Sequence, residues 1–306
     1  MNRLLLLFLS TTFSLFTASQ VHATAVPIPV VASFSILGDM VQSIGGEAVH
    51  VTTLVGPNGD AHVYQPTPHD AKAVALAQLV VVNGLGFEGW MSRLVRSSGF
   101  TGQMVVATEG VVPRDNHGVA DPHAWQDLRN GMVYVRNIER ALIAVDPLHA
   151  TAYQAHAKDY LTRLDTLDRE VRTQLAALPA ENRRFITSHD AFGYFAAAYG
   201  LTLLAPVGAS TDAEASAADV AALVRQIRRE QVKAVFMENI TDPRLVQRIA
   251  AETGAVMGGT LYSDALSDVR GPAATYLAMF HNNLQVLVET LTPTVARRDR
   301  IPASPP

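Results

Sequence analysis

Four short stretches of the chain each contain one side chain that could bind a transition metal. They span residues 60–68, 121–125, 187–190 and 261–264, and the candidate ligands in them are His62, His123, His189 and Asp264. Imidazole nitrogen and carboxylate oxygen are ligand types that suit zinc and its first-row neighbours, and four of them complete a tetrahedral shell. A filled shell indicates a protein that holds a metal ion rather than one that uses it in catalysis.

The elements that must position these ligands can be read from short apolar runs bounded by Gly, Asn, Asp or Thr. In the first half, strands are predicted at 29–33, 51–55, 79–82 and 104–107, and helices at 36–44, 71–77 and 90–96. In the second half, strands are predicted at 185–187, 201–204, 234–237 and 254–257, and helices at 194–199, 217–230, 243–253 and 272–290. Apolar strands separated by helices are typical of a mainly parallel sheet covered on both faces. Each half is therefore predicted to be a small α/β lobe.

One long helix is predicted between the halves. Apolar residues recur at steps of three and four from Tyr153 to Leu178, which is the period of one helix face. Pro147 supplies a start and Pro179 a stop. A helix over 147–178 would be roughly 48 Å long, enough to join the lobes as a rigid strut. The predicted organisation is a signal peptide at 1–23, an N-terminal lobe at 24–146, the long helix at 147–178, a C-terminal lobe at 179–296 and a disordered tail at 297–306.

The N-terminus and the composition indicate an exported protein. An apolar run from Leu4 to about Ala18 leads to Val21-His22-Ala23, a small-residue pattern typical of a secretory cleavage site. The run is shorter than the ~20 residues of a spanning helix. The chain has no cysteine, so it offers no disulfide, no thiolate ligand and no cysteine for a lipid anchor. With 24 basic and 28 acidic residues spread along the chain, no nucleic-acid partner is indicated. We expect a periplasmic protein without a lipid anchor, and a monomer.

The four candidate ligands are expected to converge in space. Each lies at or just after the carboxyl end of a predicted strand, where open α/β sheets bind ligands. Two ligands come from each half, so the site should lie in the cleft between the lobes. Carboxylates next to the ligands could orient the imidazole rings, and Asp121, Asp190 and Glu238 are the candidates by adjacency.

The remaining histidines are expected to be solvated or packed rather than bound to metal. His50, His69, His149, His156 and His281 lie before a strand or within helices. His117 differs because its loop, 113–118, leads directly into the stretch that contains His123. It is a candidate for transient metal capture, and an exposed loop histidine is the alternative.

The motifs 59–68, 121–125, 187–195 and 236–239, together with Glu252-Thr253-Gly254 and the Asp264 loop, carry a resemblance over about 29–291. The chain resembles the cluster A-I, or family 9, solute-binding proteins of ABC importers for zinc and manganese. The resemblance implies two α/β lobes joined by a long helix, a metal ion between them, and delivery to a permease and ATPase complex at the inner membrane. By position, His62, His123, His189 and Asp264 match the family's four ligands. A periplasmic metallochaperone is a further partner to consider.

The choice of metal follows from two differences within the resemblance. The loop 113–120 lacks the histidine-rich insert common in zinc-specific members, which removes one argument for zinc. His189, however, stands where manganese-binding relatives often have glutamate, and imidazole in place of a carboxylate favours zinc. We therefore expect zinc, with manganese or iron(II) as the alternative. A zinc hydrolase with Glu238 as general base is the alternative from another class.

Overall fold

The computed structural model describes residues 26–116 and 118–292. The predicted signal peptide and the predicted disordered tail lie outside these residues, as does His117. Within the described part of the chain, no helix combines the length and the apolar character needed to cross a membrane.

The first lobe is a four-stranded parallel sheet with the strand order β2-β1-β3-β4. Val30, Ala32 and Phe34 of β1 are buried, as are the residues between them, because helices cover both faces of the sheet. A short antiparallel hairpin follows the sheet. The elements are β1 (Ile28–Phe34), α1 (Ser35–Gly45), β2 (Val49–Val55), α2 (Pro68–Leu76), β3 (Leu79–Val82), α3 (Met91–Ser98), β4 (Gln103–Val106), β5 (Asp115–Asn116) and β6 (Val119–Ala120).

The second lobe repeats this plan, with the parallel order β10-β9-β7-β8. In both sheets the first strand of the lobe lies between its second and third. Neighbouring residues of one strand point to opposite faces. Phe185 joins the large core shared with α9 and with the long helix α5 (Ala150–Ala176), whereas Ile186 joins a smaller core beneath α7 and α8. The elements are β7 (Arg184–Ile186), α6 (Gly193–Tyr199), β8 (Thr202–Leu204), α7 (Ala217–Glu230), β9 (Ala234–Glu238), α8 (Arg244–Thr253), β10 (Val256–Leu261) and α9 (Tyr276–Leu291).

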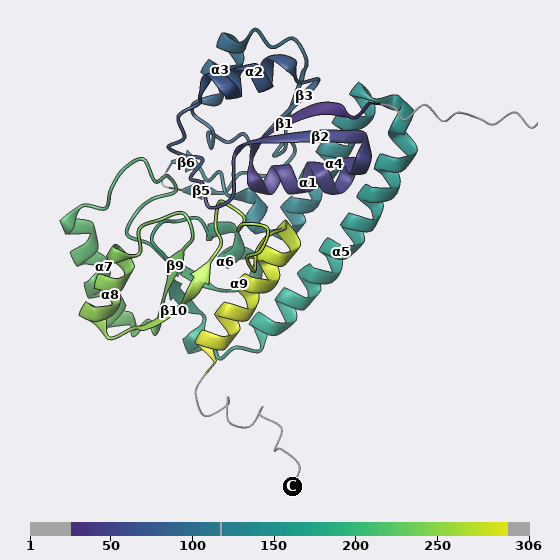
Figure 1. Cartoon of the computed structure of the whole chain (residues 1–306). Coiled ribbons are helices and arrows are strands. Elements are labelled where there is room, and N and C mark those ends of the chain that lie inside the picture. The colour runs from purple at the N-terminus through teal and green to yellow at the C-terminus, as the bar shows by residue number, and fades with distance from the viewer. Residues whose placement is uncertain (1–25, 117, 293–306) are drawn as a thin grey trace, which may run out of the picture.

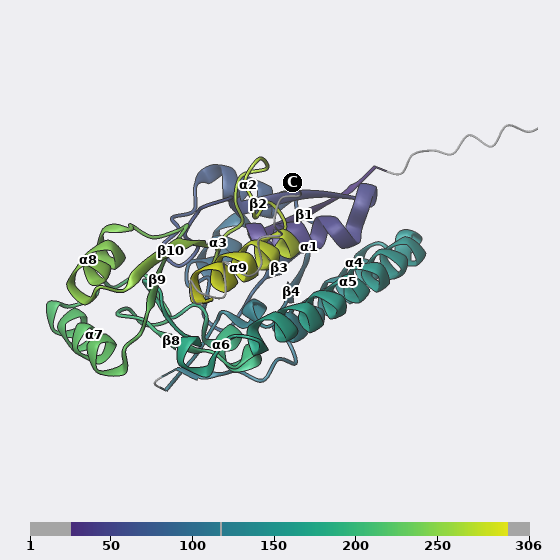
Figure 2. The same ribbon diagram turned by 90° about the horizontal axis from the view of Figure 1, so that it is seen from below.

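A long helix, α5 (Ala150–Ala176), joins the two lobes and packs beside α4 (Leu128–Val145) (Figures 1 and 2). It also contacts α1 of the first lobe and both α6 and α9 of the second. The predicted stripe is the buried face: Tyr153, Leu164 and Leu175 are at most 3% exposed. The fold class is therefore confirmed, whereas the exact division of the chain into domains stays a prediction.

Three of the differences from the predicted element boundaries have a clear local cause. The segment Pro147–His149 is a 3-10 turn, so the α-helix proper is 27 residues long, or about 40 Å. Gly254 adopts a left-handed conformation that ends α8, so β10 begins two residues later than predicted. The last helix begins at Tyr276 rather than Pro272 because Thr275 caps it, accepting a hydrogen bond from the Ala278 amide.

Candidate metal centre

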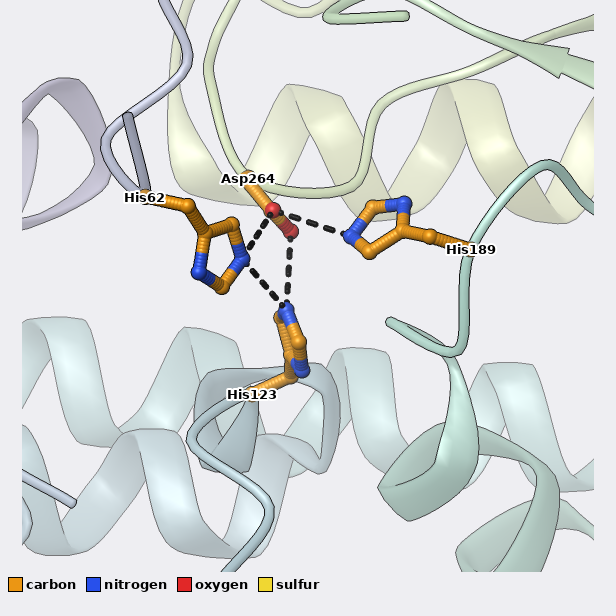
Figure 3. A group of neighbouring side chains, drawn as sticks. All are labelled: His62, His123, His189 and Asp264. Carbon is orange, nitrogen blue, oxygen red and sulfur yellow. Dashed lines mark hydrogen bonds and ion pairs between the residues drawn. The ribbon is translucent and has the colours of Figure 1, made fainter. Parts of the chain in front are cut away.

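The four predicted ligands meet at one point between the lobes. Figure 3 shows the rings of His62, His123 and His189 directing nitrogens toward the carboxylate of Asp264. Asp264 Oδ2 lies 3.2 Å from His62 Nε2 and 3.1 Å from His189 Nε2, and Oδ1 lies 3.5 Å from His123 Nε2. One ligand atom from each of the four residues lies within 4.8 Å of the others. This spacing lets four donors share one small cation.

The centre is almost completely shielded from solvent. The side chains of His123 and Asp264 are fully buried, and those of His189 and His62 are 1% and 4% exposed. Asp264 Oδ1 is a buried carboxylate oxygen without a hydrogen-bond partner. Such an atom is costly unless a cation neutralises it, so its position fits a metal-binding role.

His123 is oriented by a chain of charged groups. Its Nδ1 lies 2.8 Å from Asp121 Oδ1, and Arg114 Nη1 donates to Asp121 Oδ2 at 2.9 Å. Burial disfavours the charged ring, but the carboxylates of Asp264 and Asp121 outweigh burial and raise the pKa of His123 to about 9. The same contacts lower the pKa of Asp121 despite its burial. Asp121 therefore fixes the ring so that Nε2 faces the centre.

His189 has an equivalent partner in Glu238, at the end of β9. Its Nδ1 lies 2.9 Å from Glu238 Oε2, an ion pair that lacks the alignment of a hydrogen bond. Glu238 Oε1 accepts hydrogen bonds from the amides of Ser188 and His189 at 2.8 and 3.0 Å. Burial opposes charging of the ring, but Glu238 and Asp264 raise the pKa of His189 well above its usual value. His123 and His189 in turn overcome the burial of Asp264 and hold its pKa well below the usual range.

The loop that carries Asp264 is fixed to the first lobe. The 3-10 turn Ala124–Gln126, directly after His123, donates two hydrogen bonds to the carbonyl of Ser263: from Trp125 Nε1 at 3.0 Å and from Gln126 Nε2 at 2.7 Å. The Leu266 amide donates to Ser35 Oγ at 2.9 Å. Asp264, the candidate ligand from the C-terminal half, is thus held at a fixed place relative to His123.

The loop that carries His62 is held by its own neighbours. Asp60 Oδ1 accepts from the His62 amide at 2.9 Å, and the carbonyl of Ala61 accepts from Trp90 Nε1 at 2.8 Å. The Phe87 ring packs edge-on against the imidazole, with centroids 4.7 Å apart. This packing limits the ring's rotation and excludes water from one side of the centre.

The other residues considered in the sequence fall outside the centre or outside the described chain. Asp190 bonds elsewhere, since its Oδ2 accepts from Asn116 Nδ2 at 3.0 Å. His149 pairs with Asp146 at 2.6 Å, and His156 Nδ1 lies 3.0 Å from the carbonyl of Ile44. Adjacency in sequence does not reveal the roles of Arg114, Trp125 and Gln126, although Trp125 is the last residue of the motif 121–125 and Gln126 directly follows it. The role of His117 stays a prediction.

The proteins similar to this chain are named for metal binding. The iron-binding protein YfeA of Yersinia pestis is 33% identical over 273 residues, covering 87% of each chain. The manganese-binding lipoprotein MntA of Bacillus subtilis is 32% identical, covering 86% of this chain and 90% of its own. Among solved structures, the periplasmic zinc-binding protein TroA of Treponema pallidum superposes with a TM-score of 0.83 at 30% identity, covering 87% of this chain and 99% of that one.

The family comparison covers most of the chain. Residues 30–290 match the sequence profile of the zinc-uptake complex component A, periplasmic. A Mn-bound periplasmic metal-binding protein from Candidatus Liberibacter asiaticus, 33% identical, also superposes with a TM-score of 0.78, covering 86% of this chain and 98% of that one. The chain therefore belongs to the zinc-uptake component A family, the extracytoplasmic metal-binding components of ABC importers.

Proposed function

We propose that this protein captures Zn²⁺ between its two lobes in the periplasm and delivers it to the permease and ATPase of an ABC importer. The observation that carries the proposal is the convergence of three imidazole Nε2 atoms and one carboxylate within 4.8 Å in a buried cleft. Three nitrogen ligands and one oxygen ligand suit tetrahedral zinc better than the oxygen-rich shells that manganese prefers. Loading by a periplasmic metallochaperone and a monomeric state remain predictions.

Manganese or iron(II) is the second candidate cargo. Both oxygens of Asp264 face ring nitrogens, so the carboxylate could bind through both oxygens and enlarge the shell beyond four. Similar proteins named for iron and for manganese support this alternative. It differs from the zinc proposal only in the identity of the ion.

A zinc hydrolase is disfavoured by the position of its required base. Glu238 contacts the remote nitrogen of His189, and its Oε1 accepts from two amides and from Ser188 Oγ at 2.5 Å. A carboxylate held in this way orients a ligand and is not free to activate a metal-bound water. The similar proteins are likewise named as binding components.

Metal analysis of protein purified from periplasm tests both the site and the metal. We expect one zinc ion per chain, lost in His123→Ala and kept in the matched variant His50→Ala, whose histidine is exposed on β2. Competition for a chromogenic chelator then compares zinc with manganese. Manganese affinity equal to or above zinc affinity would assign the cargo to the alternative.

Cell fractionation tests the location. Several similar proteins are named lipoproteins, whereas the 306-residue sequence contains no cysteine. We expect the protein in the periplasmic fraction without detergent. Recovery only with membranes would contradict the periplasmic proposal.

A further inference from the structure

The segment of residues 206–215, between β8 and α7, separates two cavities that lead to the metal centre. A cavity of about 560 Å³ reaches His189 on one side of the segment, and one of about 650 Å³ reaches His62 on the other. Val207 and Glu214 line both cavities. We call residues 206–215 the strap, because an ion that leaves by either cavity must pass beside it.

The base of the strap is tied to the loop of a ligand. Val207 pairs with His189 in an isolated bridge, and the Asp190 amide donates to the carbonyls of Val207 and Gly208, each at 3.2 Å. These contacts therefore hold the base of the strap to the loop that carries His189. Asn116 Nδ2, from the hairpin of the first lobe, bonds to Asp190 Oδ2 and holds this loop independently of the strap tip.

The tip of the strap is tied across the cleft to the first lobe. Thr211 Oγ1 donates to Asp60 Oδ2 at 2.6 Å, a hydrogen bond between residues 151 positions apart. The other oxygen of the same carboxylate accepts from the His62 amide. Among the hydrogen bonds of the described residues, this is the one that joins the strap to the first lobe. Asp60 thus connects the strap to the loop that carries His62.

We propose that Thr211 and Asp60 form a latch that positions the strap over the metal centre and controls the rate of metal exchange. The proposal rests on the proposed function, since it concerns access to that same site. The latch touches no ligand atom, and the Asn116–Asp190 bond still holds the His189 loop when the latch opens. The latch should therefore change the rates of capture and release together, and the equilibrium affinity much less.

Stopped-flow release of Zn²⁺ to an excess of chelator tests the latch, with capture rate and affinity measured in parallel. Thr211→Val should accelerate release about tenfold, the change expected for losing one hydrogen bond to a carboxylate. Capture should accelerate similarly, so that Kd stays within about threefold of the parent value. Thr211→Ser keeps the hydroxyl and should restore both rates. Ser210→Ala is the matched control, because exposed Ser210 bonds only weakly within the strap, accepting from Asp212 at 3.4 Å.

Each result bears on the latch. Unchanged release in Thr211→Val, equal acceleration in Ser210→Ala, or no rescue by Thr211→Ser would overturn it. A Kd that weakens in step with release while capture stays constant would also overturn it, because Thr211 would then act on affinity. A parent protein that binds no zinc would refute the proposed function as well, which separates that failure from failure of the latch alone.

Discussion

The metal-free protein should lose stability as the pH rises from neutral to alkaline, opposite to the usual behaviour of a carboxylate-rich site. His123 has a pKa of about 9 in the folded chain against about 6.5 in an unfolded one. The folded state therefore binds its proton more tightly. The corresponding stability is fully present below pH ~6.5 and is lost as the pH rises through about 9.

The size of the effect follows from that difference in pKa. It corresponds to about 3 kcal/mol of metal-free stability for His123 alone. His189 adds to it in the same direction, since its pKa is also raised. Asp264, Asp121 and Glu238 have lowered pKa values, so they are ionised in both states across this range and contribute a constant amount.

Urea unfolding of chelator-treated protein between pH ~6.5 and ~9 measures the effect. The zinc-saturated protein is the internal control: its rings carry no proton at Nε2, so its stability should level off above pH ~6.5 and the two curves should separate. His123→Gln should make the metal-free curve less steep, leaving the contribution of His189, and His50→Gln should leave the curve unchanged. Metal-free stability that stays constant or increases over this range would refute the reasoning.

Three substitutions test the remaining contacts. His189→Glu should shift relative affinity from zinc toward manganese by about tenfold, roughly 1.4 kcal/mol, because a harder ligand replaces an imidazole; competing titrations of the two ions measure it. Glu238→Gln should lower zinc affinity about 10- to 100-fold by removing the carboxylate that orients His189, and an unchanged affinity would contradict that role. Trp125→Phe should keep the ring packing but lose the bond to Ser263, costing about 1 kcal/mol in urea unfolding; a loss near zero would show that Gln126 holds the loop alone.

The fold could be predicted from the sequence because its signals are local. Apolar strands, helical stripes and caps each depend on a few neighbouring residues, so the eight strands of the two sheets and α5 lie close to their predicted places. No helix is predicted at α4, because its buried face includes Gly131 and the polar Asn137. The buried Asn137 Nδ2 donates hydrogen bonds to the carbonyls of Ala107 and Glu109, each at 2.8 Å. A search for periodic apolar residues does not detect a buried position that is polar.

The convergence of the four candidate ligands could be predicted for a topological reason, whereas the contacts that support them could not. Parallel strands bring their carboxyl ends to one edge, so ligands that follow different strands converge without knowledge of their contacts. The supporting bonds depend on side chains far apart in sequence: Trp125 reaches Ser263 across 138 positions. Adjacency therefore predicts Asp121 and Glu238, which contact His123 and His189, but it also predicts Asp190, whose carboxylate bonds to Asn116 instead.

The charges around the centre would allow protons and a divalent ion to replace one another there. Asp264, Asp121 and Glu238 carry three negative charges, and Arg114 on Asp121 compensates one of them. A divalent cation among neutral imidazoles neutralises the other two. In the metal-free chain the pKa values of His123 and His189 are raised, so both rings bind a proton. These two protons supply the same charge of +2 as the divalent cation, in the same buried volume. Because no carboxylate is left uncompensated in either state, cargo can be released without the penalty of a buried unpaired charge. The same exchange makes protons direct competitors of the metal, so capture should be tighter at alkaline than at acidic pH.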